Sequence, residues 1–479
     1  MKSIELKYSK SNILGIIIIL FLIIAGIFYP ISVTIFVTIV VFFIIALKSL
    51  SKALIFILAT HPITRDGFVI TIGIFDIHYI YILQLIIILI WLLQNKRKLK
   101  NNFKQIKFLY KVLIISLLFA VVSTLIGGFS SAGLREIIKY VLDIVTTYVV
   151  YKIVFSDVNI GIKILKKWIV AIYIIAIISF VMSIFFTNPF PSYRLRYEGS
   201  KEIIQYMPTQ SFEYYTTSDY GQESYKRLEI GFGAPYGSYP CVLMAALLVS
   251  LGVLIERKLH FKIKKTVLVN MSFTIFLVLI FTYTRSAWVG LATGVFFLFM
   301  FSKYKFQILK ITIPLLVFLV IFQPSSVTQR LVQMNPSDQE GSVVSHLRTF
   351  QVAVEAINSH PILGVGYANL PSVGDMIDVS RGRGVVHSAI LQRWAELGTI
   401  GLTLFLIIPF YLFYVEKQIE RTKNLDIYNL YNRGIISALI GIAIQSIFIP
   451  GLDVIYWFLL GFSLAFTHYL LHQKVLIKK

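Results

Sequence analysis

The chain has 479 residues, of which 57% are hydrophobic, with a mean hydropathy of +0.79 and a formal net charge of +22. A soluble protein of this size needs a more polar surface, so the composition excludes one. The lysines and arginines gather in short loops between long apolar segments, which is the pattern of a membrane topology signal. They therefore favour contact with anionic lipid and exclude nucleic acid as the partner. The single cysteine, Cys241, excludes an internal disulfide and any multi-cysteine metal site.

The apolar segments predict an all-α fold, a polytopic transmembrane bundle of about twelve helices. The alternating ten-residue segments of a membrane barrel are absent. At the amino-terminal end, residues 12–29 and 31–47 predict a hairpin broken at Pro30, and 77–93 predict another span. Between them, residues 49–75 are too polar for one clean crossing. The first apolar segment is not a cleaved signal, because no small-residue cleavage site follows it.

A basic loop at residues 96–107 places that part of the chain in the cytoplasm and fixes the direction of the spans that follow. These spans are predicted near residues 108–127, 135–155, 166–186, 237–255, 266–284, 286–302, 309–323, 399–415, 433–449 and 453–471. The whole chain, 1–479, thus reads as one transmembrane domain.

Two long loops are predicted on the outer side, and loops of this length are usually functional or disordered. Residues 187–236 are rich in tyrosine, and residues 323–398 contain arginine but no lysine. Within the second loop, residues 341–358 predict an amphipathic helix that starts after Ser342 and ends before Pro361. We expect this helix to lie on the outer interface or, alternatively, to pack on the bundle without a role in function. Its predicted apolar face consists of Leu347, Phe350, Val354 and Ile357.

Arg285 lies at the outer break between two strongly apolar segments, within FTYTRSAWVGLATG. It could simply anchor the membrane interface. However, Ser286, Gly290 and Gly294 follow at four-residue spacing and predict a face that another helix approaches closely. Arg285 would then face a packed bundle, where its planar guanidinium suits a phosphate group.

Two further segments carry residues that suit catalysis. Arg227 precedes a glycine-rich turn in RLEIGFGAPYGSYP, whose glycines permit close backbone approach or serve only the geometry of the turn. His387 follows another glycine-rich stretch and starts a helical segment at residues 388–397. A helix amino terminus keeps imidazole neutral, so His387 could act as a general base, although a lone histidine is often structural. Glu396, nine residues later, is half a turn out of phase with His387 on a continuous helix and is expected in a supporting position beside an arginine.

Other charged residues have simpler interpretations. Lys139 and Asp143 are four residues apart in one span and are expected to pair with each other. Asp375 and Asp378 stand in a loop without further ligands at metal spacing, so no metal is predicted.

Three motifs occur in order: R-L-x-x-G-F-x-x-P, then T-R-S-A-W-x-G, then R-T-F-x-x-A-x-x-x-I-x-x-x-P-I-L-G-V-G-Y followed by H-S-x-x-L-x-x-W-A-E-L-G-x-x-G. Together they resemble the O-antigen ligase and O-antigen polymerase family of bacterial membrane glycosyltransferases. The resemblance implies a helical C-type glycosyltransferase fold, a sugar donor carried on undecaprenyl pyrophosphate, and no metal or other cofactor. It implies that two arginines hold the pyrophosphate and that a histidine serves the acceptor. By motif, these catalytic residues are Arg227, Arg285 and His387.

The same motifs assign substrate-binding positions, which are Arg348, Tyr236, Trp288 and Glu396. The chain departs from the family pattern at Ser388, where asparagine usually follows the histidine. It also departs at Ala234 and Tyr236, which flank Pro235 where asparagines are common. These departures leave the arginine roles intact and weaken the assignment of the base.

We therefore expect an enzyme of the bacterial cytoplasmic membrane, with its active site on the outer face, that polymerises lipid-linked oligosaccharide for a capsule, O-antigen or teichuronic-acid-like polymer. A ligase that transfers glycan to a lipid or wall acceptor is the first alternative, and a peptidoglycan glycosyltransferase fits the long outer loop poorly. A flippase or transporter of lipid-linked sugars would place charges at mid-membrane depth along several helices, often with inverted repeats. Expected partners are membrane lipids and the chain-length regulator and flippase of the same pathway.

Overall fold

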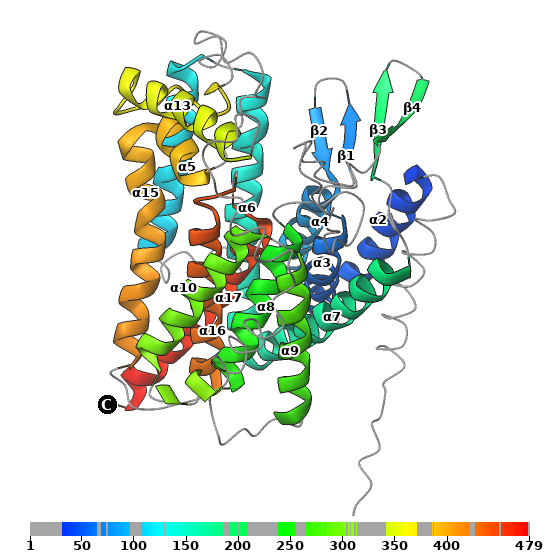
Figure 1. Ribbon diagram of the computed structural model, residues 1–479, viewed down its shortest axis with the longest axis vertical. Helices are drawn as coiled ribbons and strands as arrows, with labels where there is room; N and C mark the ends of the chain where they lie inside the picture. Colours follow the sequence, from blue (N-terminus) through cyan, green and yellow to red (C-terminus); the bar gives the residue numbers. More distant parts are fainter. Residues whose placement is uncertain are drawn as a thin grey trace, which may run out of the picture.

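The computed structural model describes most of the helical part of the chain. The described residues are 31–64, 69–72, 75–95, 107–128, 130–185, 192–198, 201–207, 238–254, 265–282, 284–302, 305–306, 308–310, 313, 342–370, 386, 388–420, 427–449 and 452–477. The predicted span at 12–29, almost all of the predicted span at 309–323, and Asp375 and Asp378 lie outside them. We call the end of the bundle at the top of Figure 1, where α13 and the strands lie, the upper end, and the opposite end the lower end.

The amino-terminal part consists of α2 (Ile31–Lys48), α3 (Leu50–Thr64) and α4 (Tyr79–Asn95), which pack against one another. The polar segment predicted not to cross cleanly forms the short helix α3 and then two strands, β1 (Val69–Ile72) and β2 (Phe75–His78). The strands end the helix before it reaches the length of about 20 residues that spans a bilayer.

A small sheet at the upper end is the main departure from the predicted all-α fold. Strands β3 (Ser192–Glu198) and β4 (Lys201–Met207) come from the predicted aromatic loop and form an antiparallel hairpin. β3 also pairs in parallel with β1, giving the order β2-β1-β3-β4. The helical architecture is otherwise confirmed. These strands have only four to seven residues, and the alternation of Tyr193, Leu195 and Tyr197 with polar residues in β3 was interpreted only as an aromatic loop.

The middle of the chain forms α5 (Lys107–Ile126) and α6 (Ser131–Ser156), close to the predicted boundaries, and α7 (Val158–Phe185), which begins eight residues before the predicted span at 166–186. α8 (Ser238–Leu254) follows and is buried along its entire length. A helix that is apolar all round belongs in the core of a large bundle, and α8 occupies that place. α9 (Lys265–Phe281), α10 (Arg285–Phe301), α16 (Ile427–Gln445) and α17 (Val454–Ile477) complete this region, in which α16 packs against α8, α10 and α17 (Figure 1).

The predicted small-residue face of α10 is confirmed. A Cβ added at Gly290 would lie 2.6 Å from the carbonyl oxygen of Gly441 on α16, and one added at Gly294 would lie 3.0 Å from that of Ser437. Only glycine permits this backbone approach, so the two helices are fixed against each other at close range.

Two helices build the upper end near the carboxyl-terminal half. α13 (Ser342–Ser359) confirms the predicted helix, and it packs on α15 (Ala389–Glu420). The predicted apolar face was displaced by about one residue: Val354 is 48% exposed, whereas Val352, Ala353 and Ala356 are buried. α15 and residues 365–370 cover the face of the helix that carries Val352, Ala353 and Ala356.

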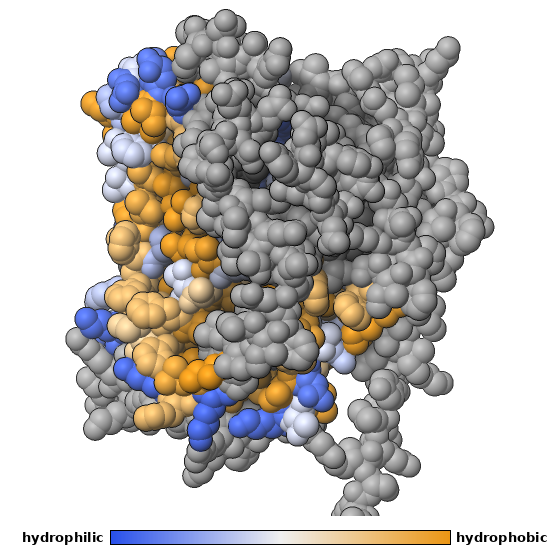
Figure 2. Space-filling view, viewed as in Figure 1, coloured by the Kyte–Doolittle hydropathy of each residue, from blue (hydrophilic) through white to orange (hydrophobic). Residues whose placement is uncertain are grey.

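Four described helices are long and apolar enough to cross a membrane. They are α5, α7, α15 and α17, by the ranges Phe108–Ile126, Val158–Val181, Ala389–Gln418 and Val454–Leu471. Figure 2 shows an apolar band on the face that α15 and α10 share, between hydrophilic atoms at the upper and lower ends. Large apolar side chains in this band are strongly exposed, including Phe410 at 70% and Phe296 at 62%. A surface of this kind fits a lipid environment.

Candidate functional site

The structure describes some of the predicted site residues and not others. Arg227, Tyr236 and His387 lie outside the described residues. Arg348 lies in α13, where only the backbone at that position is described. The side chains of Arg285, Trp288 and Glu396 are described, and they belong to two separate elements, α10 and α15.

Arg285 is the first residue of α10 and is half-buried. Thr284 precedes it in an extended conformation, and its side chain makes no capping hydrogen bond to α10. The hydroxyl of Thr284 instead donates to the carbonyl oxygen of Thr282 at 3.2 Å. A helix amino terminus without a side-chain cap keeps backbone N–H groups available, and these add to the attraction that an arginine has for an anion.

Trp288 lies one turn further along α10 and ties the helix to the end of α9. Its indole Nε1–H donates to the carbonyl oxygen of Leu279 at 3.4 Å, and its ring packs against the main core. Trp288 therefore helps to fix the direction in which α10 leaves the break between the two helices.

Ser388 caps the amino terminus of α15, directly after the position of His387. Its hydroxyl accepts from the N–H of Leu391 at 3.3 Å, and its carbonyl accepts from the N–H of Gln392 at 2.8 Å. Serine and asparagine are comparably good N-caps, so the departure from the family pattern at Ser388 keeps the start of this helix. The N–H of Ala389 also lies 2.8 Å from the carbonyl of Ser446, beyond the end of α16.

The motif glycines hold α15 through what we call the glycine clasp, defined as residues 361–366 and 395–399. Its backbone hydrogen bonds run from Val365 N–H to Ala395 O (3.0 Å), from Gly366 N–H to Glu396 O (2.9 Å) and from Thr399 N–H to Pro361 O (2.9 Å). A Cβ at Gly364 would lie 2.3 Å from the carbonyl oxygen of Glu396. The two motif segments therefore require glycine, because their backbones are in direct contact.

Gly398 divides α15 into two helical pieces. It adopts φ 63° and ψ −171°, a conformation open almost only to glycine. The bend turns the helical segment 389–397 inward from the longer piece that follows, as Figure 1 shows near the top of α15. The orientation of the segment next to His387 thus depends on a single backbone conformation.

Asn369 joins the clasp to the turn between α5 and α6. Its amide nitrogen donates to the carbonyl oxygens of Gly127 (3.1 Å), Gly128 (2.8 Å) and Val365 (3.0 Å), and its Oδ1 accepts from the hydroxyl of Ser130 (3.1 Å). One side chain therefore connects two segments that are about 240 positions apart in sequence.

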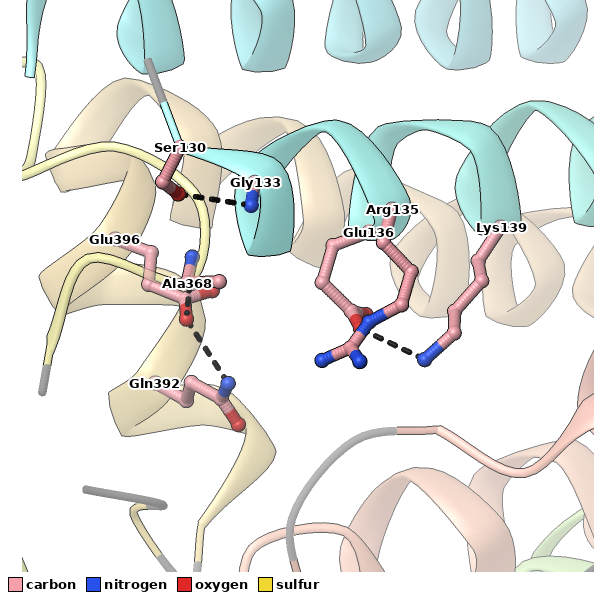
Figure 3. A network of polar contacts seen from close by, with 8 residues as sticks. All are labelled: Ser130, Gly133, Arg135, Glu136, Lys139, Ala368, Gln392 and Glu396. Atoms are coloured by element: carbon pink, nitrogen blue, oxygen red, sulfur yellow. Dashed lines mark hydrogen bonds and ion pairs between the residues drawn. The ribbon is translucent and has the colours of Figure 1, made fainter. Parts of the chain in front are cut away.

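Glu396 is buried, at 2% exposure, and supports the same region. Its Oε1 accepts from the N–H of Ala368 at 3.2 Å and from the side-chain amide of Gln392 at 2.9 Å (Figure 3). The supporting position predicted for Glu396 agrees with these contacts. No arginine lies within ion-pair distance of its carboxylate among the described residues, but Arg393 interacts with it electrostatically.

A group of charged residues on the first turns of α6 was not predicted as part of a site (Figure 3). Lys139 Nζ lies 2.7 Å from Glu136 Oε1, and Arg135 Nε lies 3.7 Å from the same oxygen. The predicted pair of Lys139 with Asp143 is therefore wrong. Asp143 lies one turn deeper and accepts instead from the amide of Gln84 at 3.2 Å, while the long lysine side chain reaches the more exposed Glu136.

Arg393 of α15 completes this group from the other side. Its guanidinium Cζ lies 4.5 Å from the ring centre of Tyr367 and 5.6 Å from that of Tyr140, so the arginine contacts two aromatic rings. Such contacts hold a cation without using its N–H groups. The sequence offered only one signal, the placement of an arginine between His387 and Glu396.

A second unpredicted pair lies inside the bundle. His61 on α3 and Asp453 before α17 are both buried, and His61 Nε2 lies 2.5 Å from Asp453 Oδ1. Asp453 also accepts from the N–H of Ile455 at 2.9 Å and so caps α17. One polar residue of the segment 49–75, His61, is thus paired inside the bundle.

Among the described residues, no group of histidine, cysteine, aspartate or glutamate side chains could hold a metal ion. Cys241 is a free, buried cysteine. The described part of the site is instead a set of arginines, amides and helix ends, which suits the binding of anionic and hydroxyl-rich groups.

These features define a helical membrane protein whose polar residues converge near one end of an apolar bundle. The family described as O-antigen ligase matches residues 271–406. The match contains Arg285, Arg348, His387 and Glu396 together with the glycine clasp, and it supports the resemblance to the O-antigen ligase and polymerase family. No curated protein sequence matches the chain. The family indicates a glycosyltransferase-like enzyme that processes membrane glycans on lipid-linked oligosaccharides.

Proposed function

We propose that the protein polymerises oligosaccharide repeat units linked to undecaprenyl pyrophosphate into a surface polysaccharide, at the outer face of the bacterial cytoplasmic membrane. The observation that carries the proposal is the position of Arg285, half-buried at an uncapped helix terminus inside the segment that matches the O-antigen ligase family. A half-buried arginine at a helix end of an apolar bundle suits an anionic ligand, and the resemblance to the matching family suggests a diphosphate.

The proposed topology rests on the distribution of basic residues. Lys265 begins α9 and Lys417 lies in the last turn of α15, and both are exposed at the end of the bundle opposite Arg285. Positively charged loops face the cytoplasm, so the lower end is assigned there and the upper end to the outer face.

In the proposed reaction, a hydroxyl oxygen of the acceptor saccharide attacks the anomeric carbon of the donor from the face opposite the diphosphate. The bond between that carbon and the diphosphate oxygen breaks, the configuration inverts, and undecaprenyl pyrophosphate leaves. His387 takes the proton of the attacking hydroxyl. Arg285 and Arg227 stabilise the charge that grows on the diphosphate, an effect worth about 3 kcal/mol for one well-placed donor.

The remaining candidates support this centre. Arg348, Tyr236 and Trp288 contact the saccharide or its carrier, and Glu396 holds the segment that carries His387 in place. The reaction needs neither a metal nor another cofactor. The chain-length regulator and flippase of the same pathway are the proposed protein partners.

The test uses purified protein in detergent, without an ion gradient, supplied with one lipid-linked oligosaccharide and no other acceptor. A polymerase produces a ladder of longer lipid-linked products, whereas a ligase produces none without its own acceptor and a transporter makes no product at all. Arg285→Gln should lower the rate about a hundredfold, since that is the effect of losing one such donor, and Arg285→Lys should fall between this variant and the wild type. Thr293→Val, an exposed change on the same helix, should keep the wild-type rate. A wild-type ladder from folded Arg285→Gln would falsify the role assigned to Arg285.

A further inference from the structure

The charged group at the start of α6 contains more cations than its nearest carboxylate can pair. Arg135, Lys139 and Arg393 all interact with the single carboxylate of Glu136. Two deeper acids, Asp143 and Glu396, bring the formal charge of the whole group to zero. Arg393 interacts electrostatically with both of these carboxylates, but their hydrogen bonds come from amides.

Two guanidinium donors in this group have no hydrogen-bond acceptor among the described residues. They are Nη1 of Arg393 and Nε of Arg135, and both atoms are buried. A buried charged donor without an acceptor costs free energy, and such donors usually mark the place of an absent ion, water or ligand. The rings of Tyr140 and Tyr367 contact the guanidinium of Arg393 without using its N–H groups, so these N–H groups remain able to bind a ligand.

The group is accessible to a ligand. The side chains of Arg135, Glu136 and Lys139 are 32%, 30% and 20% exposed. Figure 3 shows that they project from one side of α6 into the same space, across from Gln392 and Glu396 of α15. The group thus lies beside the segment that follows His387, on the helix end assigned to the outer face.

We propose that Arg135, Lys139 and Arg393 form a second oxyanion site, which binds the diphosphate of the lipid-linked saccharide that acts as acceptor. This inference rests on the proposed function: an enzyme that joins two lipid-linked saccharides holds two diphosphates at once, and Arg285 and Arg227 are assigned to the donor. Two guanidinium groups and one ammonium group suit the several oxygens of a diphosphate better than a single carboxylate.

The experiment counts binding sites for radiolabelled inorganic pyrophosphate by equilibrium dialysis of the full-length protein in detergent at low ionic strength. The wild type should bind two pyrophosphates per chain, and the double variant Arg135→Gln/Arg393→Gln should bind one, or bind the second at least tenfold more weakly. Lys152→Gln is the matched control, because Lys152 is a cation on the same helix that contacts the rings of Tyr148 and Tyr151 away from this group. It should keep two sites.

Arg135→Gln alone decides the question if the double variant does not fold, because Arg135 is one-third exposed and its replacement should not disturb the packing. An unchanged number of sites and unchanged affinity in folded Arg135→Gln would overturn the proposal. Competition with glucuronate tests the other source of an oxyanion, the carboxylate of an acidic sugar. If glucuronate displaces the second pyrophosphate as well as unlabelled pyrophosphate does, the assignment to diphosphate is wrong.

The same variants separate this inference from the proposed function. If the wild type makes no polymer but Arg135→Gln still loses one pyrophosphate site, the oxyanion site stands and the polymerase is rejected. Polymer formation with an undiminished second site in Arg135→Gln would keep the polymerase and reject the oxyanion site.

Discussion

Replacement of Gly398 by alanine should be among the most damaging single changes in the described part of the protein. The residue adopts φ 63° and ψ −171°, which L-residues with a side chain avoid. A Cβ at this position would lie 2.1 Å from the carbonyl oxygen of Ile362 and 2.7 Å from the nitrogen of Gly364. Both neighbours are backbone atoms, so no side chain can rotate away to make room.

The magnitude follows from two contributions. The backbone conformation itself costs about 1–3 kcal/mol for a residue other than glycine. To bring the 2.1 Å contact to 3.0 Å, the two backbones must separate by 3.0 − 2.1 = 0.9 Å. This separation breaks or weakens the hydrogen bonds Thr399 N–Pro361 O and Gly366 N–Glu396 O, each worth about 1 kcal/mol. We expect Gly398→Ala to lower the free energy of unfolding by about 3–5 kcal/mol.

The assay is denaturant-induced unfolding of the purified protein in detergent, followed by tryptophan fluorescence. Trp394 is a suitable probe because its indole N–H donates a hydrogen bond to Thr399 of the clasp. Gly128→Ala is the matched control. Gly128 also has a positive φ, +100°, but an added Cβ there meets no atom within 4 Å, so it measures backbone strain alone. The two variants should differ by about 2 kcal/mol, the value of the two clasp hydrogen bonds. Equal destabilisation would refute the view that backbone contact within the clasp requires glycine.

Three further changes test the supports of α15 and of the bundle by the same unfolding measurement. Ser388→Ala should lower stability by about 1 kcal/mol through loss of the N-cap, while Ser388→Asn should stay within a few tenths of the wild type; a loss in Ser388→Asn equal to that in Ser388→Ala would contradict the capping role. Asn369→Asp should cost about 2–3 kcal/mol, because a carboxylate cannot donate to the three carbonyl oxygens that the amide contacts; an unchanged stability would refute those contacts. His61→Leu should lower the free energy of unfolding by about 3–5 kcal/mol, because it removes the histidine that pairs with the buried Asp453. Adding Asp453→Asn should recover part of this loss. No recovery would show that the loss comes from packing and not from the unpaired charge.

Much of the helical fold could be predicted from the sequence, because long apolar segments carry a strong and local signal. The boundaries of α5, α6, α8, α9 and α10 lie close to those predicted, and the glycine spacing of α10 correctly indicated close packing. The position of α13 was also predictable from spacing and a start signal. Its buried face was not, because the neighbours that cover it come from residues 365–395 and not from the helix itself.

The contacts that build the polar centre could not be predicted in the same way. His61 and Asp453 are 392 positions apart, and Asn369 contacts residues about 240 positions earlier in the chain. Pairings at such separations depend on the order of helices in space, which local periodicity does not encode. The choice between Glu136 and Asp143 as partner of Lys139 was likewise decided by depth in the bundle rather than by spacing.

The motifs that this chain shares with the matching family consist of two kinds of residue, and the structure separates them by their neighbours. Gly364, Gly398 and Ser388 contact backbone, so they determine where α15 begins and how its first segment points. Arg285 lies at a helix end and does not set the start or the direction of α15 in this way. Substitutions of the first kind should therefore lower stability and activity together. Arg285→Gln should lower activity while the unfolding curve stays close to that of the wild type, because Arg285 is only half-buried at the first position of α10, whereas the close backbone contacts of this helix lie at Gly290 and Gly294.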